Sequence, residues 1–491
     1  MKEQGLKDKT IAGLMWAAVQ RFGTSILSFL ANLVLARLLL PEDLGCVGML
    51  YVFIAISETL IDGGFGAALI QRKNPSQTDY STVFFWNLFI SLCLFVTLQF
   101  GAPLVARFYK IDILTDILRV ISIVVIINAF SAIPTNILTK NLQFKTLAKF
   151  NLIATATGAS IAIIAAFMGF GVWSLVIKTI ATSICLTLCL WLSRVWKPTA
   201  EFSLASLKSL FNFGGLILLS SIVQTVYDNI QSLIIGRVYS SKDLGFYSQA
   251  KKVEEMPSST MSVVVNQVTF PVFSQIADDK VRFRDSLRKN LICITYLNFP
   301  LMILLILIGK PLILFLYTDK WAESIPYFQI LCLYSMLITV NAINTNVIKS
   351  RGKSKLFFWL QLTKRFVGLI CIIIGMRFGI IGMTWGVVVS AYIWWLMGAF
   401  FSGREIQYGI PQQFRDTYKH YFLSIAVGIA VYFMTSSFAV SSLLLLLIQA
   451  FLFIALFLLI SGLLKFEGFQ LYKEILFNYL LKRWPRLNPN R

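Results

Sequence analysis

The sequence predicts an all-α polytopic membrane protein with about 14 transmembrane helices. We expect two six-helix lobes, related by a pseudo-two-fold axis along the membrane normal, and two further C-terminal helices. Three observations predict this fold. The 491-residue chain is 57% hydrophobic and 14% charged, which excludes a soluble globular protein of this length. Apolar segments of about 20 residues, long enough to cross a bilayer as helices, recur from end to end. Short sequence patterns of the first half also recur, in the same order, in the second half.

The first apolar segment follows the basic stretch MKEQGLKDKT and contains Arg21. It is too long for the core of a signal peptide and has no small-residue cleavage site, so we expect it to be a retained helix. The other segments are identified by their length and apolar content. The spans are expected at about 11–36, 44–70, 80–106, 113–138, 146–168, 172–194, 210–236, 244–275, 290–317, 324–348, 356–376, 379–402, 418–436 and 440–464.

Lys and Arg residues set the expected orientation, because cytoplasmic loops carry an excess of them. Most basic residues between the spans fall on the side that holds both termini. The opposite side carries Arg37, Arg107, Lys110, Arg237, Lys242, Lys320 and Arg377. The sequence therefore predicts cytoplasmic termini. The net charge of +21 is mostly this orientation signal and does not predict nucleic-acid binding, because the basic residues are scattered over short loops.

An internal repeat defines the expected lobes. Asp43-Leu44-Gly45 recurs 200 residues later as Asp243-Leu244-Gly245, and Thr135-Asn136-Ile137 recurs as Thr345-Asn346-Val347. Ala36-Arg37, Pro103-Leu104 and Phe170-Gly171 have counterparts in the same order. Because the repeat contains an even number of spans, both copies have the same topology, with a substrate site expected between them. The expected regions are an N-lobe at 1–196, a cytoplasmic interfacial linker at 197–209, a C-lobe at 210–403, helices 13 and 14 at 417–464, and an amphipathic cytoplasmic tail at 465–491.

Charged residues inside the spans mark the candidate site, since a charge at bilayer depth costs about 2.5 kcal/mol or more. In SETLIDGGFGAAL, residues 57–69, two carboxylates lie four residues apart. We expect Arg21 to pair with one or both, and Asp228 to pair with Lys251 or Lys252. Polar residues at helical spacing suit a hydrated cavity between the lobes. The predicted cavity residues are Arg21, Glu58, Asp62, Arg119, Lys178, Asp228, Lys251, Lys252, Glu255, Lys364, Arg365, Gln20 and Gln224.

Several other features favour structural roles. Glu254 and Glu255 can neutralise Lys251 at helical spacing, and Lys364 and Arg365 can extend to the inner surface. The glycines of GGFG indicate close helix packing or a helix break, with a hinge as the alternative. The seven Cys lie in apolar spans and the single residue His420 lies in a polar connection, so zinc binding and Ser-His catalysis are not expected. We expect neither catalytic residues nor a cofactor.

The stretches LARLLLPEDLG, LIDGGFGAALIQRK, YSTVFFWNL, APLVARFY and GFGVWSLV resemble the polysaccharide transporter family. This family includes Wzx-type lipopolysaccharide and exopolysaccharide exporters and belongs to the multidrug/oligosaccharidyl-lipid/polysaccharide flippase superfamily. The resemblance implies that a polyprenyl-diphosphate-linked oligosaccharide, such as an O-antigen or exopolysaccharide repeat unit, crosses the bacterial inner membrane from the inner to the outer leaflet. It implies no enzyme activity, and the family supplies no motif for individual site residues.

Two alternatives stay open at this point. A drug or cation antiporter of the same superfamily would suit a more acidic cavity, and a polysaccharide polymerase would need a large external loop. The partners expected are the lipid-linked oligosaccharide and membrane lipids, with other polysaccharide assembly proteins as candidates. The coupling ion, H⁺ or Na⁺, is open.

Overall fold

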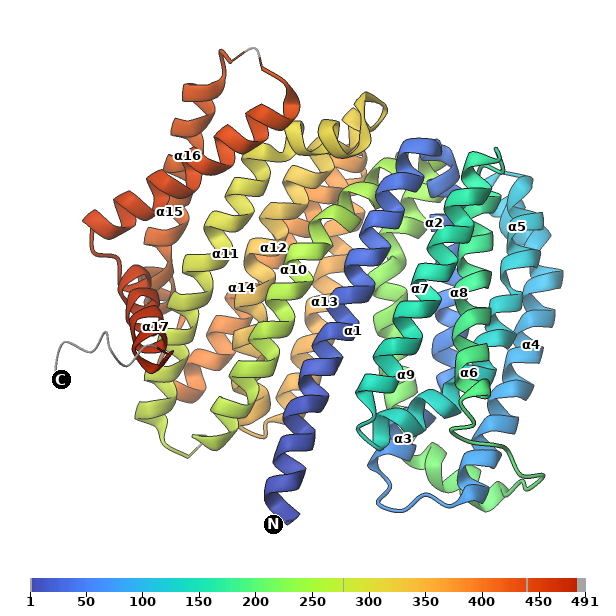
Figure 1. The fold of residues 1–491 in the computed structure, drawn as a ribbon. Helices are drawn as coiled ribbons and strands as arrows, with labels where there is room; N and C mark the ends of the chain where they lie inside the picture. Colours follow the sequence, from blue (N-terminus) through green and yellow to red (C-terminus); the bar gives the residue numbers. More distant parts are fainter. Residues whose placement is uncertain (1, 277, 439, 484–491) are drawn as a thin grey trace. The chain divides into compact units, whose positions relative to one another are not determined.

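The structure is a computed structural model, and it describes residues 2–276, 278–438 and 440–483, apart from the side chains of 2–12, 14, 264, 267, 268, 475, 476 and 478–483. Every regular element within these ranges is a helix (Figure 1), as the sequence predicts. The helices of the chain's first part are α1 (Lys2–Leu38), α2 (Pro41–Asp62), α3 (Phe65–Gln71), α4 (Gln77–Tyr109), α5 (Ile113–Ile121), α6 (Ile123–Lys140), α7 (Phe144–Phe167), α8 (Trp173–Leu192) and α9 (Leu204–Val238). The remaining helices are α10 (Ser241–Gln275), α11 (Lys280–Tyr317), the 3₁₀ helix η1 (Asp319–Ser324), α12 (Ile325–Ser350), α13 (Ser354–Met376), α14 (Gly379–Ile406), α15 (Ile410–Thr435), α16 (Ser442–Leu463) and α17 (Glu467–Arg483).

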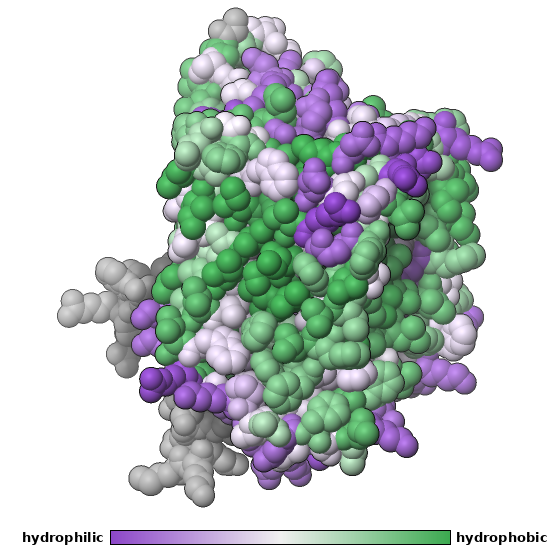
Figure 2. Space-filling model, turned by 90° about the vertical axis from the view of Figure 1, so that its right-hand side faces the viewer, coloured by the Kyte–Doolittle hydropathy of each residue, from purple (hydrophilic) through white to green (hydrophobic). Residues whose placement is uncertain are grey.

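Twelve helical segments of the described chain are long and apolar enough to cross a membrane. The eighth and thirteenth expected spans, which correspond to α10 and α15, are not among the twelve. Both are long helices with many polar residues, since α10 contains KKVEE and α15 begins IPQQFRDTYKH. On the face shown in Figure 2, hydrophobic side chains cover most of the surface and hydrophilic ones gather toward its upper and lower ends. This distribution is typical of a protein that spans a bilayer.

The chain forms two compact units, Met1–Ser248 and Gln249–Arg491. In the first unit α7 packs along both α1 and α8, and α4 packs on α6. Helix α9 belongs to this unit because it packs on α2, α3 and α4. Residues 204–209 of the expected interfacial linker are the first turns of α9, which runs without interruption from its N-cap, Ser203. In the second unit α12 packs between α11 and α14, while α15, α16 and α17 pack on α11.

The GGFG stretch breaks a helix, as one of the two sequence interpretations expects. Gly63 and Gly64 have φ values of +55° and +73°, which residues with a Cβ rarely adopt, and they separate α2 from α3. The backbone of Gly64 also lies directly against Gly214 of α9, where a Cβ would overlap the carbonyl group. Phe65 and Leu69 of α3 then pack in a buried cluster with Phe84 of α4. The two glycines therefore both turn the chain and admit a neighbouring helix.

The internal repeat is visible as a reciprocal contact inside the first unit. A Cβ added to Gly45 would lie well inside 3.0 Å of the Ser241 carbonyl group, and one added to Gly245 would overlap the Pro41 carbonyl group in the same way. Gly245 lies 200 residues after Gly45, and Ser241 lies 200 residues after Pro41, so the two contacts exchange equivalent positions of the repeat. Such exchange of partners is the signature of a two-fold relation. The starts of α2 and α10 therefore cross about a local pseudo-two-fold axis.

The C-terminal helices are held to the second unit by an ionic cluster. Arg288 of α11 donates from Nε to Asp416 of α15 at 3.0 Å and from Nη1 to Glu467 of α17 at 2.7 Å. Tyr408 donates its hydroxyl proton to the same Asp416 oxygen at 2.6 Å. Burial and this bond to Asp416 raise the pKa of Tyr408, which lies in the connection between α14 and α15. The tail is helical as expected over Glu467–Arg483, and its last part, 484–491, lies outside the described residues.

Candidate functional site: polar groups within the spans

The two carboxylates of α2 have neutral partners. Asn128 of α6 donates a hydrogen bond to Glu58 at 2.7 Å. Asp62 accepts hydrogen bonds from the backbone N–H groups of Gly64 and Gly66, so it caps the start of α3. The missing side chain of Gly66 leaves room for this, because a Cβ there would overlap Asp62 and press on Asn136 of α6. Glu58 and Asp62 thus stabilise the break between α2 and α3 and the packing of this region on α6.

The predicted pairing of Arg21 with these carboxylates is wrong in this structure, because α1 packs along α7. Gly23 admits Leu152 of α7, and Lys145 of α7 lies over the ring of Trp16 at 5.5 Å. Arg21 is exposed, and no ion pair joins it to Glu58 or Asp62 in the described part of the chain. Gln20 is half-buried on the same helix, and its carbonyl oxygen accepts a hydrogen bond from Thr24.

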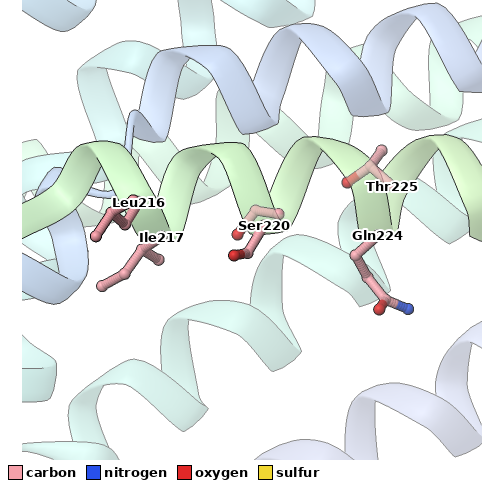
Figure 3. Close-up of a pocket in the computed structure, with 6 residues that line it drawn as sticks. Leu216, Ile217, Ser220, Gln224 and Thr225 are labelled. Carbon is pink, nitrogen blue, oxygen red and sulfur yellow. The ribbon is translucent and has the colours of Figure 1, made fainter. Parts of the chain in front are cut away.

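A cavity of about 540 Å³ opens along one face of α9 and is lined by Leu216, Ile217, Ser220, Ser221, Gln224 and Thr225. Leu216, Ile217, Ser220 and Gln224 point to the same side of the helix, whereas Thr225 points to the opposite side (Figure 3). The Thr225 hydroxyl lies 3.0 Å from that of Thr59 on α2, which joins the two helices. Gln224 donates to both carboxylate oxygens of Asp228 at 2.7 Å. Part of the polar face predicted for this helix therefore forms a cavity wall that offers hydroxyl and amide groups, while Asp228 holds the Gln224 amide from outside the lining.

The remaining predicted cations of the first unit differ in their surroundings. Arg119 lies at the exposed end of α5, and its Nε is 3.5 Å from the carbonyl oxygen of Gln99 on α4. Lys178 is half-buried in α8, near the close crossing with α7 at Gly158. Its amino group makes no ion pair with any described residue. Lys178 is thus the in-span cation of this unit best placed to accept an anionic partner.

In the second unit, Lys251 and Glu255 form an ion pair at 3.6 Å on one face of α10. Lys252 is exposed on α10 and Arg365 is half-buried on α13. Lys364 does not extend to the surface as one interpretation allows, because it is 4% exposed and its amino group lies 3.5 Å from Oδ1 of Asn341 on α12. The predicted pairing of Asp228 with Lys251 or Lys252 would join two separate units and stays a prediction.

The sequence interpretation missed two residues. It grouped Glu254 and Glu255 with Lys251. The pair of Lys251 with Glu255 is confirmed, whereas Glu254 is 3% exposed and accepts hydrogen bonds from Ser335 of α12 and Ser258. Asn128 was missed because a neutral amide gives no signal in a search for charges. Among the described residues, no group of three or more His, Cys, Asp and Glu could hold a metal ion. Ser220, Ser221, Gln224 and Lys178 carry hydrogen-bond donors that polar or anionic groups could accept.

Comparison with known proteins agrees with this fold. The model of the family described as polysaccharide biosynthesis protein matches residues 34–326. The teichuronic acid biosynthesis protein TuaB of Bacillus subtilis is 24% identical over 86% of this chain and 88% of its own length. The lipopolysaccharide biosynthesis protein WzxC of Escherichia coli is also 24% identical, over 86% of this chain and 85% of its own length.

Solved structures show the same architecture. The lipid II flippase MurJ in an inward closed conformation superposes with a TM-score of 0.75 at 18% identity, covering 92% of this chain and 98% of MurJ. An inward-facing multidrug resistance MATE transporter of the MOP superfamily gives a TM-score of 0.60 at 17% identity, covering 80% of this chain and 99% of its own. The matched family model spans more than half of the sequence, and the chain belongs to the polysaccharide biosynthesis protein family.

Proposed function

We propose that this protein is a flippase that moves a polyprenyl-diphosphate-linked oligosaccharide from the cytoplasmic to the outer leaflet of a bacterial inner membrane. The observation that carries the proposal is the polar wall of α9, where Ser220, Ser221 and Gln224 line a cavity of about 540 Å³. The names of the relatives, which concern teichuronic acid and lipopolysaccharide biosynthesis, support a saccharide substrate. The MurJ-like fold supports movement of a lipid-linked one.

The chemistry of the wall suits a sugar head group. Sugar hydroxyls both donate and accept hydrogen bonds, and the wall supplies the hydroxyls of Ser220 and Ser221 and the amide of Gln224. Polar groups that leave water must regain their hydrogen bonds, or each costs about 1–3 kcal/mol. A head group with many hydroxyls therefore gains from this wall what it loses from water. The polyprenyl tail stays in the bilayer, because its burial in lipid is already favourable.

In-span cations supply the binding partners for the diphosphate. Lys178 has no anionic partner in the described chain, and Arg119 is exposed at the end of its span. We propose that Lys178 and Arg119 bind the diphosphate in the first unit, and that Lys251 and Lys252 bind it in the second. A ligand shifts an equilibrium between inward-open and outward-open states only through different affinities for the two. Cations at different depths provide such a difference.

Transport in proteoliposomes tests the proposal. Purified protein is reconstituted with a short-chain polyprenyl-diphosphate-linked disaccharide, and an impermeant sugar oxidase reports its exposure on the outer surface. We expect the protein to increase the oxidised fraction over protein-free liposomes, with inhibition by excess unlabelled lipid-linked sugar. Lack of exposure, together with uptake or efflux of a fluorescent cation by the same liposomes, would instead indicate the drug antiporter alternative.

A further inference from the structure

Another cavity lies within the second unit, between α11, α12, α14 and α15. Its volume is about 140 Å³ and its walls are mostly aromatic. The lining includes Leu337 and Val340 of α12, Tyr392 and Trp395 of α14, and Tyr418 of α15. An apolar cavity of about 150 Å³ holds a group of the size of benzene, whereas pockets for drug-sized ligands occupy roughly 300–1,000 Å³. The space therefore suits a short stretch of hydrocarbon and is too small for an oligosaccharide head group.

An aromatic wall, formed by Phe414, Tyr418 and Phe422 of α15, borders the cavity on its open side. Phe414 and Phe422 line the cavity but are 52% and 57% exposed, so the cavity opens at the protein surface. Phe414 stacks on Tyr418 with ring centroids 5.9 Å apart, and Tyr418 meets Phe422 edge-on at 6.4 Å. Aromatic side chains of this kind gather where a membrane meets water. The wall begins near the connection between α14 and α15, on the predicted cytoplasmic side.

Two cations flank the aromatic wall. Arg415 and Lys419 are exposed on α15, and each lies three residues before a ring of the wall, so both are beside it on the helix surface. Neither forms an ion pair with a described residue. The carboxylate next to Arg415 in sequence, Asp416, is already bound by Arg288 at 3.0 Å. The open side of the cavity therefore carries positive charge that no carboxylate of the described chain neutralises.

Neutral hydrogen-bond donors lie deeper than Arg415. The hydroxyls of Tyr392 and Tyr421 are 3.2 Å apart, which sets the register between α14 and α15. Trp395 and Tyr418 each lie three residues nearer to the α14–α15 connection, so they share a level about one helical turn from the tyrosine pair. Neither the indole N–H of Trp395 nor the hydroxyl of Tyr418 has a hydrogen-bond partner among the described residues. Buried Tyr and Trp side chains usually have one.

We propose that this cavity binds an anionic glycerophospholipid of the bilayer leaflet on the predicted cytoplasmic side. The lipid phosphate lies against Arg415 and Lys419, the ester carbonyl oxygens accept hydrogen bonds from Trp395 and Tyr418, and part of one acyl chain enters the cavity. A glycerophospholipid carries its phosphate, esters and chain in this same order. A polyprenyl diphosphate has no acceptor between its diphosphate and its chain, so it matches the site less well.

Removal of the two cations should abolish the preference for anionic lipid. Each Lys or Arg near a membrane surface favours anionic lipid, so Arg415→Gln with Lys419→Gln should weaken binding of phosphatidylglycerol by about tenfold or more. Lys280→Gln with Arg284→Gln is the matched control, because it also removes an exposed Lys and an exposed Arg four residues apart on a helix of the same unit. Tyr418→Phe keeps the ring and removes one donor, so it should weaken binding several-fold.

Thermal unfolding measures these affinities. A lipid that binds the folded state raises the unfolding temperature as its concentration rises. The full-length protein, stripped of lipid in detergent, is titrated with dioleoyl phosphatidylglycerol or with dioleoyl phosphatidylcholine. We expect the wild type and the control to prefer phosphatidylglycerol and R415Q/K419Q to respond to both lipids alike. Equal responses of the wild type to the two lipids, or an unchanged preference in R415Q/K419Q, would overturn the proposal.

A photoreactive phosphatidylglycerol locates the acyl chain in the wild type, so this measurement holds even if a variant does not fold. A diazirine on one acyl chain is activated in lipid nanodiscs, and labelled peptides are identified by mass spectrometry. We expect labelling concentrated in residues 392–395 and 414–422 and suppressed by excess phosphatidylglycerol. Even labelling of all lipid-facing helices would indicate bulk lipid only and overturn the site.

Competition in the same nanodiscs separates the bilayer lipid from a transported one. Suppression of the label by a polyprenyl diphosphate, but not by phosphatidylglycerol, would assign the cavity to the substrate tail and overturn the proposal. Neither readout requires transport. A protein that fails to flip a lipid-linked sugar but shows the expected labelling would lose the proposed function and keep the phospholipid site.

Discussion

Replacing Gly45 by Ala should destabilise the fold strongly, because the crossing of α2 and α10 leaves no room for a side chain. An added Cβ would overlap the carbonyl oxygen and carbon of Ser241 and would press on its Cα. These are backbone atoms, so no rotamer change relieves the overlap. The helix starts would have to separate by about 1 Å, and a gap of that size forfeits a quarter to a half of the dispersion energy across it.

We expect Gly45→Ala to lower stability by about 3 kcal/mol, at the upper end for an overpacked site. Gly101→Ala in α4 is the matched control, because no atom lies within 4 Å of its added Cβ. That control should raise stability by about 0.5–1 kcal/mol, because Ala is the better helix former. Both variants are compared with the wild type by thermal unfolding of purified protein in detergent.

Gly245→Ala tests the reciprocity of the contact. It should cost about as much as Gly45→Ala, because its Cβ would overlap the Pro41 carbonyl group. The double variant should cost less than the sum of the two, since one separation of the helices relieves both overlaps. A Gly45→Ala protein as stable as the wild type would refute the crossing, and additive losses would refute the shared contact.

Three further predictions address the ionic cluster, a cation and the topology. Arg288→Met should lower the free energy of unfolding by about 1–3 kcal/mol, seen as a lower unfolding temperature, because it leaves Asp416, whose side chain is 8% exposed, without its cation. The control Arg282→Met, at a side chain that is 81% exposed, should change the free energy of unfolding by less than about 0.5 kcal/mol. Lys178→Gln should reduce affinity for the lipid-linked sugar by about tenfold with unchanged membrane abundance, and reduced abundance with normal activity per molecule would make it a structural residue. Asp278→Cys should react with an impermeant thiol reagent in inverted vesicles and not in intact cells, and labelling of intact cells would reverse the assigned orientation.

The all-helical fold and the repeat could be predicted because they depend on local patterns. Apolar length identifies a span without knowledge of its neighbours, and Asp43-Leu44-Gly45 recurs as an identical tripeptide. The sequence also indicated the break at Gly63 and Gly64, since consecutive glycines rarely continue a helix. The helix at Glu467–Arg483 could also be predicted, because its composition is local information.

Helix neighbours could not be predicted, because they depend on packing between distant segments. Arg21 and Glu58 lie at matching depth on consecutive spans, but α1 packs along α7 and Glu58 takes its partner from α6. Glu254 and Glu255 both lie within about one helical turn of Lys251, so spacing alone suggested that the lysine neutralises both. In the structure Lys251 forms its ion pair with Glu255. Charge identifies candidate residues, but their partners follow from which helix faces overlap.

Photo-crosslinking from α9 tests most directly whether the polar wall holds the substrate. A photoreactive residue at position 224 lies on the cavity wall, whereas one at Leu219, which is 61% exposed on the same helix, lies outside the set of residues that line it. Each variant is irradiated in proteoliposomes containing a radiolabelled polyprenyl-diphosphate-linked disaccharide. We predict a labelled protein from position 224 that excess unlabelled lipid-linked sugar suppresses, and little labelling from position 219. Equal labelling at both positions, or none at 224 in a protein that flips the lipid, would contradict the assignment of the α9 cavity.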